Sequence, residues 1–129
     1  MRLLIPFIFA AMIFLPSPVK AQKTGALISG AYLLEVCKRG QDGQELVPGG
    51  HTACQAYIAG LIDYHNLLRS LGTSPSVDLC VPNTVKLGDL QDIVYTYLQQ
   101  NKQHDAFIAA PAVSLALFEV FPCKGAVRK

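Results

Sequence analysis

The chain has 129 residues, a formal net charge of +2 and a hydrophobic content of 51%. This length fits one domain, and the balance of 11 basic against 9 acidic side chains excludes a protein that attracts nucleic acid through bulk charge. A domain of this size has little stability to spare, so its four cysteines are important as possible crosslinks.

Residues 1–21 have the features of a secretory signal peptide. Arg2 precedes an uncharged apolar run over residues 3–15, and Ala21 offers a small residue at a cleavage site. The alternative is a retained transmembrane helix, which would need about 20 apolar residues. Cleavage removes two basic residues and leaves nine of each sign. We therefore expect a neutral, exported mature domain over residues 22–129 that has no membrane contact.

The first predicted helix begins after Thr24, a suitable N-cap, and ends before Gly40, which can adopt the left-handed C-cap conformation. Its apolar residues recur at intervals of three and four, which predicts one buried face. That face comprises Leu27, Ile28, Ala31, Leu34 and Cys37. Residues 40–50 are rich in Gly and Pro and are predicted to form a loop.

The second predicted helix covers residues 52–71 and is followed by Gly72, which stops it. Its apolar face comprises Cys54, Tyr57, Ile58, Leu61, Leu68 and either Tyr64 or His65. Gly60 lies inside this helix, where it costs about 1 kcal/mol relative to Ala. The close approach of another backbone usually compensates for that cost, so we expect one at Gly60.

Two further helices are predicted in the C-terminal half. The turn-rich segment 73–85 precedes a helix over residues 87–100, which has a poor N-cap in Lys86 and a favourable first-turn Asp89. The last helix is predicted to begin near Ala110 and to end before Pro122, because proline fits a helix start better than its middle. The two apolar faces comprise Leu87, Leu90, Ile93, Val94, Tyr97 and Leu98, and then Val113, Ala116, Leu117, Val120 and Phe121.

No segment alternates with a period of two for long enough to require a strand, so the predicted fold class is all-α, a small compact bundle of four main helices. An even number of cysteines in an exported domain favours two disulfides. Consecutive helices joined by short loops are expected to be antiparallel. This topology brings Cys37 to Cys54 at one end and Cys80 to Cys123 at the other, whereas other pairings would bridge a helix length. A metal site is the alternative, but no C-x-x-C or C-x-H spacing occurs.

The sequence contains no recognisable catalytic site. It has no G-x-S-x-G, H-E-x-x-H, P-loop or dinucleotide motif, and the carboxylates are scattered. His51 is expected in a capping turn, His65 as a hydrogen-bonded packing residue, and His104 with Asp105 in a solvent-facing connection. Asp63 lies on a different face from His65. We therefore predict that the protein is not an enzyme and requires no cofactor or metal.

Several segments resemble, in order, the Rap/Tai family of type VI secretion immunity proteins. The resemblance extends over residues 33–123. It is carried by Cys54-Gln55-Ala56-Tyr57-Ile58-Ala59-Gly60-Leu61-Ile62-Asp63, by Cys80-Val81-Pro82, by Tyr97-Leu98, and by Ala116-Leu117 leading to Phe121-Pro122-Cys123. The chain departs from the family pattern at Lys86, where Thr often caps the third helix, and at Pro111.

The resemblance implies a periplasmic helical protein, usually a homodimer, that neutralises a peptidoglycan amidase effector by occluding its active site. It implies structural roles for Tyr57, Gly60, Asp63, Pro82 and Pro122 and no catalytic residues. Our candidates for partner contact are polar: Gln100, Lys102, His104 and Asp105, with the segment 73–78 and Tyr95 as further possibilities. The alternative function is a periplasmic envelope or stress binding protein of the same fold that has no cognate toxin.

Overall fold

The computed structural model describes residues 27–73 and 75–124. They form four α-helices and one 3-10 turn, which are α1 (Gly30–Cys37), α2 (Gly50–Ser70), α3 (Leu87–Gln100), η1 (Lys102–His104) and α4 (Ala109–Val120). Pairing between extended segments in this part of the chain is limited to isolated bridges. The predicted all-α class with four main helices is therefore confirmed. The predicted signal peptide and residues 125–129 lie outside the described residues.

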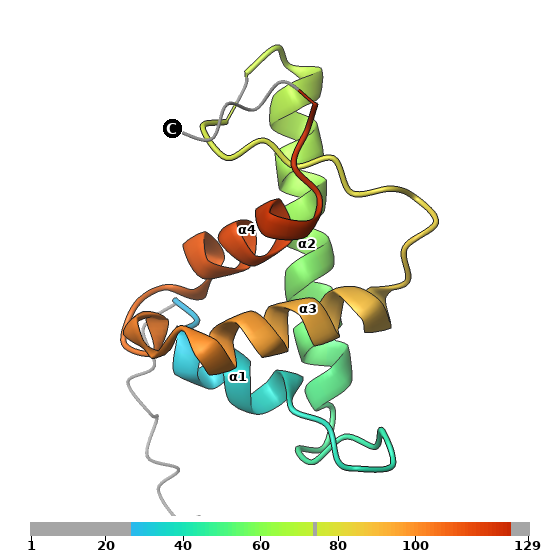
Figure 1. Ribbon diagram of the computed structural model, residues 1–129, viewed down its shortest axis with the longest axis vertical. Coiled ribbons are helices and arrows are strands. Elements are labelled where there is room, and N and C mark those ends of the chain that lie inside the picture. Colours follow the sequence, from blue (N-terminus) through green and yellow to red (C-terminus); the bar gives the residue numbers. More distant parts are fainter. Residues whose placement is uncertain (1–26, 74, 125–129) are drawn as a thin grey trace, which may run out of the picture.

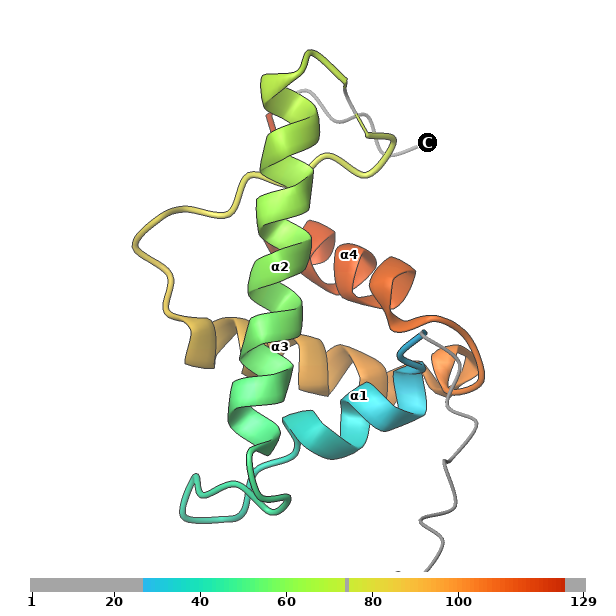
Figure 2. The same cartoon turned by 180° about the vertical axis from the view of Figure 1, so that it is seen from behind.

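Helix α2 crosses the other three helices instead of lying antiparallel to its neighbours. Figures 1 and 2 show α3 and α4 on one side of α2, with α1 beside α3. α3 and α4 run in opposite directions, as predicted, but α1 and α2 meet at a wide angle. None of the described helices combines the length and the apolar character needed to cross a membrane.

The core lies where α1, α3 and α4 meet α2. Its side chains are almost wholly buried and come from all four helices. They include Leu33, Ile58, Leu90, Val94, Leu98, Val113, Ala116 and Leu117. Val120, the last residue of α4, is half exposed and borders a hollow between α3 and α4. Its predicted place on the buried face is therefore wrong.

Helix α1 starts later than predicted and buries a different face. Ser29 is the N-cap and accepts a hydrogen bond from the Tyr32 amide (3.2 Å). The preceding residues pair with the segment before α4, since the Ala109 amide donates to the Ile28 carbonyl (2.8 Å). This pairing holds residues 27–29 outside the helix. The buried positions are Leu33, Val36 and Cys37, whereas Leu27 and Ala31 are exposed.

The end of α1 and the start of α2 also differ from the prediction. Lys38, in an extended conformation, is the C-cap of α1, so Gly40 does not fill that role. Helix α2 begins at Gly50, after Gly49 in the left-handed conformation (φ 74°). At its other end Gly72 (φ 77°) follows the C-cap Leu71, as predicted.

The close approach predicted at Gly60 occurs at two other glycines. Gly60 is exposed, and no atom lies within 4 Å of the position that a Cβ would take there. A Cβ on Gly50 would instead lie 2.7 Å from the Val36 carbonyl oxygen, and one on Gly30 would overlap the His104 carbonyl group. These two glycines stand at helix N-termini, where neighbouring backbone crosses them. Gly60 lies on an uncovered face.

Both disulfides form as predicted, Cys37–Cys54 and Cys80–Cys123. The first joins the end of α1 to the second turn of α2, and both of its cysteines are fully buried. The second ties the segment after α2 to the segment after α4, and its Cys80 is exposed. The Cys80 amide also donates to the Phe121 carbonyl (2.9 Å), so backbone pairing aligns the two segments.

Candidate functional site

The described part of the chain holds no cluster of side chains that could bind a metal ion. No three or more His, Cys, Asp or Glu side chains within it could share a metal ion. Its four cysteines are all consumed in disulfides. The three histidines lie at separate places, in the first turn of α2, near its end and in η1.

His65 has a structural role, as predicted. Its ring is 7% exposed, and Nε2 accepts the Leu79 backbone N–H at 3.0 Å. The Asp78 carboxylate lies 3.1 Å from the same nitrogen and 3.3 Å from Arg69 Nε. Together these contacts fasten the segment 75–80 to α2. The hydrogen-bond partner of His65 is therefore the Leu79 amide, with Asp78, 13 residues further along the chain than His65, beside the same nitrogen; neither was considered from the sequence.

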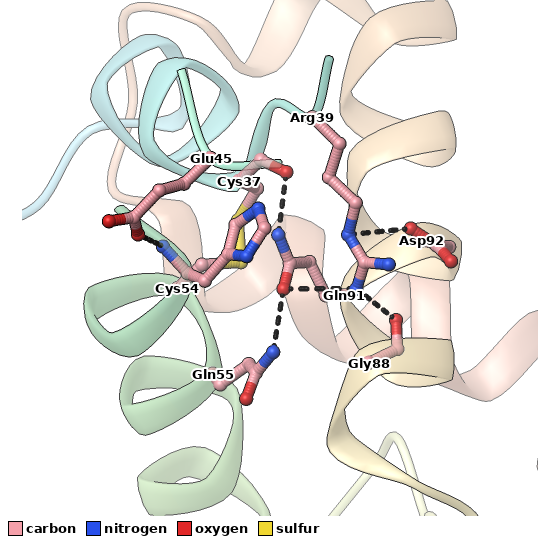
Figure 3. The surroundings of a disulfide bond; sticks show 9 residues. Cys37, Arg39, Glu45, Cys54, Gln55, Gly88, Gln91 and Asp92 are labelled. Carbon is pink, nitrogen blue, oxygen red and sulfur yellow. Dashed lines mark hydrogen bonds and ion pairs between the residues drawn. A yellow bond between two sulfur atoms is a disulfide. The ribbon is translucent and has the colours of Figure 1, made fainter. Parts of the chain in front are cut away.

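A buried amide network, not predicted from the sequence, surrounds the first disulfide (Figure 3). Gln91 is fully buried, and its Nε2 donates to the Cys37 carbonyl at 2.9 Å. Its Oε1 accepts from Gln55 Nε2 (2.9 Å) and Arg39 Nη2 (3.2 Å). The sequence signal was the spacing of Gln91, one residue after Leu90 and three before Val94, within the apolar face of α3. The network joins α1, α2 and α3, which makes it structural.

His51 lies in the predicted capping turn, and Glu45 supplies the cap. The Glu45 carboxylate accepts hydrogen bonds from the backbone amides of Gly49 (3.0 Å) and His51 (3.2 Å) at the start of α2. These two bonds lower the pKa of Glu45 below its ordinary value of 4.5. Glu45 was not predicted in this role, because its side chain reaches forward over four and six residues to the start of the helix.

The predicted partner segment 100–105 is partly committed to the fold. The Ala31 amide donates to the Asp105 carbonyl (3.1 Å), and the His104 carbonyl covers Gly30. His104 and Asp105 are half-buried, so the expectation that they face solvent is wrong. The side chains of Gln100 and Lys102 are exposed. Of the four candidates, these two are the more available to a partner.

Gln100 borders a hollow between α3 and α4. The hollow has a volume of about 360 Å³ and is lined by Asp92, Ile93, Thr96, Tyr97, Gln100, Ala116, Glu119 and Val120. Its apolar floor is flanked by two carboxylates and by no basic side chain. Burial raises the pKa of Tyr97, and the nearby Glu119 carboxylate raises it further. This face suits an apolar anchor surrounded by positive charge.

The other residues singled out from the sequence lie on different elements of the fold. Tyr57 and Tyr95 are half-buried against the core, and Asp63 is exposed on α2. Pro82 closes a turn with Val85, whose amide donates to the Pro82 carbonyl (3.1 Å), ahead of α3. Pro122 directly follows Phe121, the C-cap of α4. The structure brings none of these residues together with Gln100 and Lys102.

Residues 29–123 match the model of a protein family described as Rap1a immunity proteins. The match begins at the N-cap of α1 and ends at the last cysteine, so it contains all four helices and both disulfides. No curated protein and no solved structure matches the chain.

Proposed function

Because the chain belongs to the Rap1a immunity protein family, we propose that it binds and neutralises an effector of the type VI secretion system. The effector in this proposal is a peptidoglycan amidase, as the sequence resemblance implies, and neutralisation occurs when the immunity protein covers its active site. The observation that carries the proposal is the family match over residues 29–123, which contains the entire described helical fold.

The features of the molecule support a binding role over catalysis. The polar side chains buried in the described residues, His65 and Gln91, are both occupied by internal hydrogen bonds. The predicted signal peptide and the two disulfides support a periplasmic location, where peptidoglycan is exposed to an injected amidase and where disulfides persist. In this proposal the protein protects the cell without carrying out chemistry.

We place the effector contact on the α3–α4 hollow, which Gln100 helps to line; the exposed Lys102 lies two residues further along the chain. A tight complex requires a central anchor that fills a desolvated pocket, surrounded by contacts that exclude water. The apolar floor of the hollow offers such a pocket, and Glu119 offers a negative charge at its rim. Asp92 is already paired with Arg39 Nε at 3.3 Å, so Glu119 is the carboxylate more available to a cationic group on the effector.

A protection experiment tests both the function and the location. Cells that produce the full chain are exposed to an amidase effector encoded beside it, and the complex is captured from the periplasm. We expect survival and a stable complex with the wild-type chain. Glu119→Arg should weaken binding by about tenfold or more, because it reverses the charge at the rim.

Asn66→Arg provides the matched control, since Asn66 is exposed on α2 and does not line the hollow. It should bind and protect like the wild type. Failure of the wild-type chain to protect would reject the immunity function and favour the envelope-protein alternative. Protection that is equally strong with Glu119→Arg would keep the function and reject the hollow as the contact.

A further inference from the structure

The second disulfide, Cys80–Cys123, lies near the C-terminal end of α2 and is open to solvent on one side. Cys80 is exposed and Cys123 is 8% exposed, whereas Cys37 and Cys54 are fully buried. The segment that carries Cys123 runs from the end of α4 along the last turns of α2 (Figure 1). A thiolate in solution can therefore approach Cys80 in the folded protein. Exposed disulfides are the ones that take part in thiol–disulfide exchange.

A guanidinium group lies against the exposed sulfur. Arg69, in the last turn of α2, directs Nη1 at Cys80 Sγ across 3.4 Å. Its Nε lies 3.3 Å from the Asp78 carboxylate, which orients the side chain. Sulfur in a disulfide is a weak hydrogen-bond acceptor, whereas a thiolate carries a negative charge that a nearby guanidinium stabilises. The contact therefore suits the reduced sulfur better than the oxidised one.

Backbone hydrogen bonds hold the two cysteines opposite each other independently of the sulfur–sulfur bond. The Cys80 amide donates to the Phe121 carbonyl (2.9 Å), and the Cys123 amide donates to the Asp78 carbonyl (3.1 Å). Neither bond involves a sulfur atom, so reduction leaves both in place. The two thiols then remain neighbours, and the disulfide can re-form as an intramolecular reaction.

From these observations we infer that Cys80–Cys123 is a thiol–disulfide exchange site, which a dithiol reduces in the folded protein while Arg69 stabilises the negative charge on sulfur. This inference goes beyond the proposed function and does not depend on it. The other disulfide, buried beside Gln91, remains a permanent crosslink.

The exchange balances with the dithiol as the reductant. A thiolate of the dithiol attacks Cys80 Sγ, the bond between the two cysteine sulfurs breaks, and Cys123 leaves as a thiolate. The second thiolate of the reductant then attacks the reductant's own sulfur in the mixed disulfide, and Cys80 leaves as a thiolate beside Arg69. Each departing cysteine thiolate takes up a proton that a reductant thiol has given to water. Two electrons and two protons thus pass to the cysteines, and the reductant becomes a disulfide.

The same geometry selects a dithiol over a monothiol. After the first step the backbone bonds keep Cys123 beside the mixed disulfide on Cys80. The Cys123 thiolate can attack Cys80 Sγ and expel the incoming thiol, which restores the starting disulfide. A monothiol completes the reduction only if a second molecule arrives first, whereas a dithiol carries its second thiol with it.

Reduction of the exported protein under native conditions tests the inference. The protein is treated with dithiothreitol or with glutathione at equal thiol concentration, and mass spectrometry locates the alkylated cysteines. We expect dithiothreitol to open Cys80–Cys123 while circular dichroism keeps its helical signal. Removal of dithiothreitol and addition of oxidised glutathione should re-form the same pair. With reduced glutathione, a protein that carries one glutathione on Cys80 should not accumulate.

Variants of Arg69 test the role of its guanidinium, and the direction of the effect separates two roles. Arg69→Gln should slow reduction about fivefold, the effect of one charge a few ångströms from a sulfur in a water-like dielectric. Arg69→Lys keeps the charge and should recover much of the rate. If Arg69 only held the segment in place, its removal would loosen the segment and make reduction faster. Lys86→Gln removes a positive charge from the exposed N-cap of α3 and should leave the rate unchanged.

Several results would overturn the inference. One is reduction that occurs only in urea or that removes the helical signal. Another is accumulation of the glutathione adduct, since Cys123 would then not lie beside Cys80 after the first step. A third is an Arg69→Gln chain that is reduced as fast as the wild type or faster. Protection of cells is measured separately and tests only the immunity function.

Discussion

The two ends of α2 are held in place by different means. At its N-terminal end the disulfide Cys37–Cys54 is fully buried, Gln91 fills the space beside it with hydrogen bonds, and Gly50 lies against the Val36 carbonyl. At its C-terminal end the disulfide is partly exposed, and leucine side chains face solvent. Buried crosslinks and hydrogen bonds are therefore concentrated at the first end, while the second end exposes apolar side chains to solvent.

The largest effect should come from the disulfides. In the chain-entropy model, the loss of Cys80–Cys123, which are 43 residues apart, costs about 4 kcal/mol of unfolding free energy. The loss of Cys37–Cys54, which are 17 residues apart, costs about 3 kcal/mol. Urea unfolding of the two double-serine variants measures both values.

The two disulfides should also differ in how readily they are reduced in the folded protein. A mild thiol reductant reaches the exposed Cys80 directly, whereas Cys37 and Cys54 are both inaccessible. Alkylation followed by mass spectrometry should therefore detect Cys80–Cys123 as the first pair reduced. If both disulfides were reduced at the same rate, the two ends of α2 would open together, and the proposed difference in their accessibility would be wrong.

The next largest loss of stability should come from replacing the buried side chain of Gln91. Gln91→Leu leaves the Cys37 carbonyl and the Gln55 amide without their partner, so we expect a loss of about 3 kcal/mol in unfolding free energy. His65→Leu at the other end removes one buried hydrogen bond, to the Leu79 amide, and should cost less, about 1–2 kcal/mol. Equal losses in chemical denaturation would show that the two ends are equally constrained.

Two glycines of the same helix should respond to alanine in opposite directions. Gly50→Ala places a methyl group 2.7 Å from the Val36 carbonyl and should destabilise the fold by about 1–3 kcal/mol. Gly60→Ala meets no atom within 4 Å and should stabilise the helix by about 0.5–1 kcal/mol. Thermal unfolding at low concentration, where the monomer dominates, measures both. If Gly60→Ala destabilised the monomer, the space beside Gly60 on α2 could not be open.

The smallest effect should be the pH dependence of the stability that Glu45 contributes by capping the start of α2. Hydrogen bonds from Gly49 and His51 lower the pKa of Glu45 in the folded protein, so its stabilising contribution is present above pH 4.5. That contribution is lost as the pH falls through the folded value. The difference in melting temperature between wild type and Glu45→Gln should therefore be small at neutral pH and disappear in acid. A difference that is constant with pH would contradict this role.

The sequence by itself determined the elements that depend on local patterns. The boundaries of α3, the stop at Gly72 and the all-α class followed from periodicity and glycine chemistry, which act over a few residues. The cysteine pairing was also correct, although the α1–α2 hairpin is not antiparallel. The predicted pairing required only that the end of α1 lie near the start of α2, and a crossed arrangement meets that condition.

Only the tertiary structure decided which faces are buried and which side chains meet. The start of α1 moved to Gly30 because residues 27–29 pair with a segment 80 residues away, and no local pattern encodes that contact. The partners of His65 and Gln91 likewise come from distant positions in the chain. Gly60 could be read as a packing site or as an open one, since the same residue permits both. The direction in which α2 crosses the other helices decided that it is open.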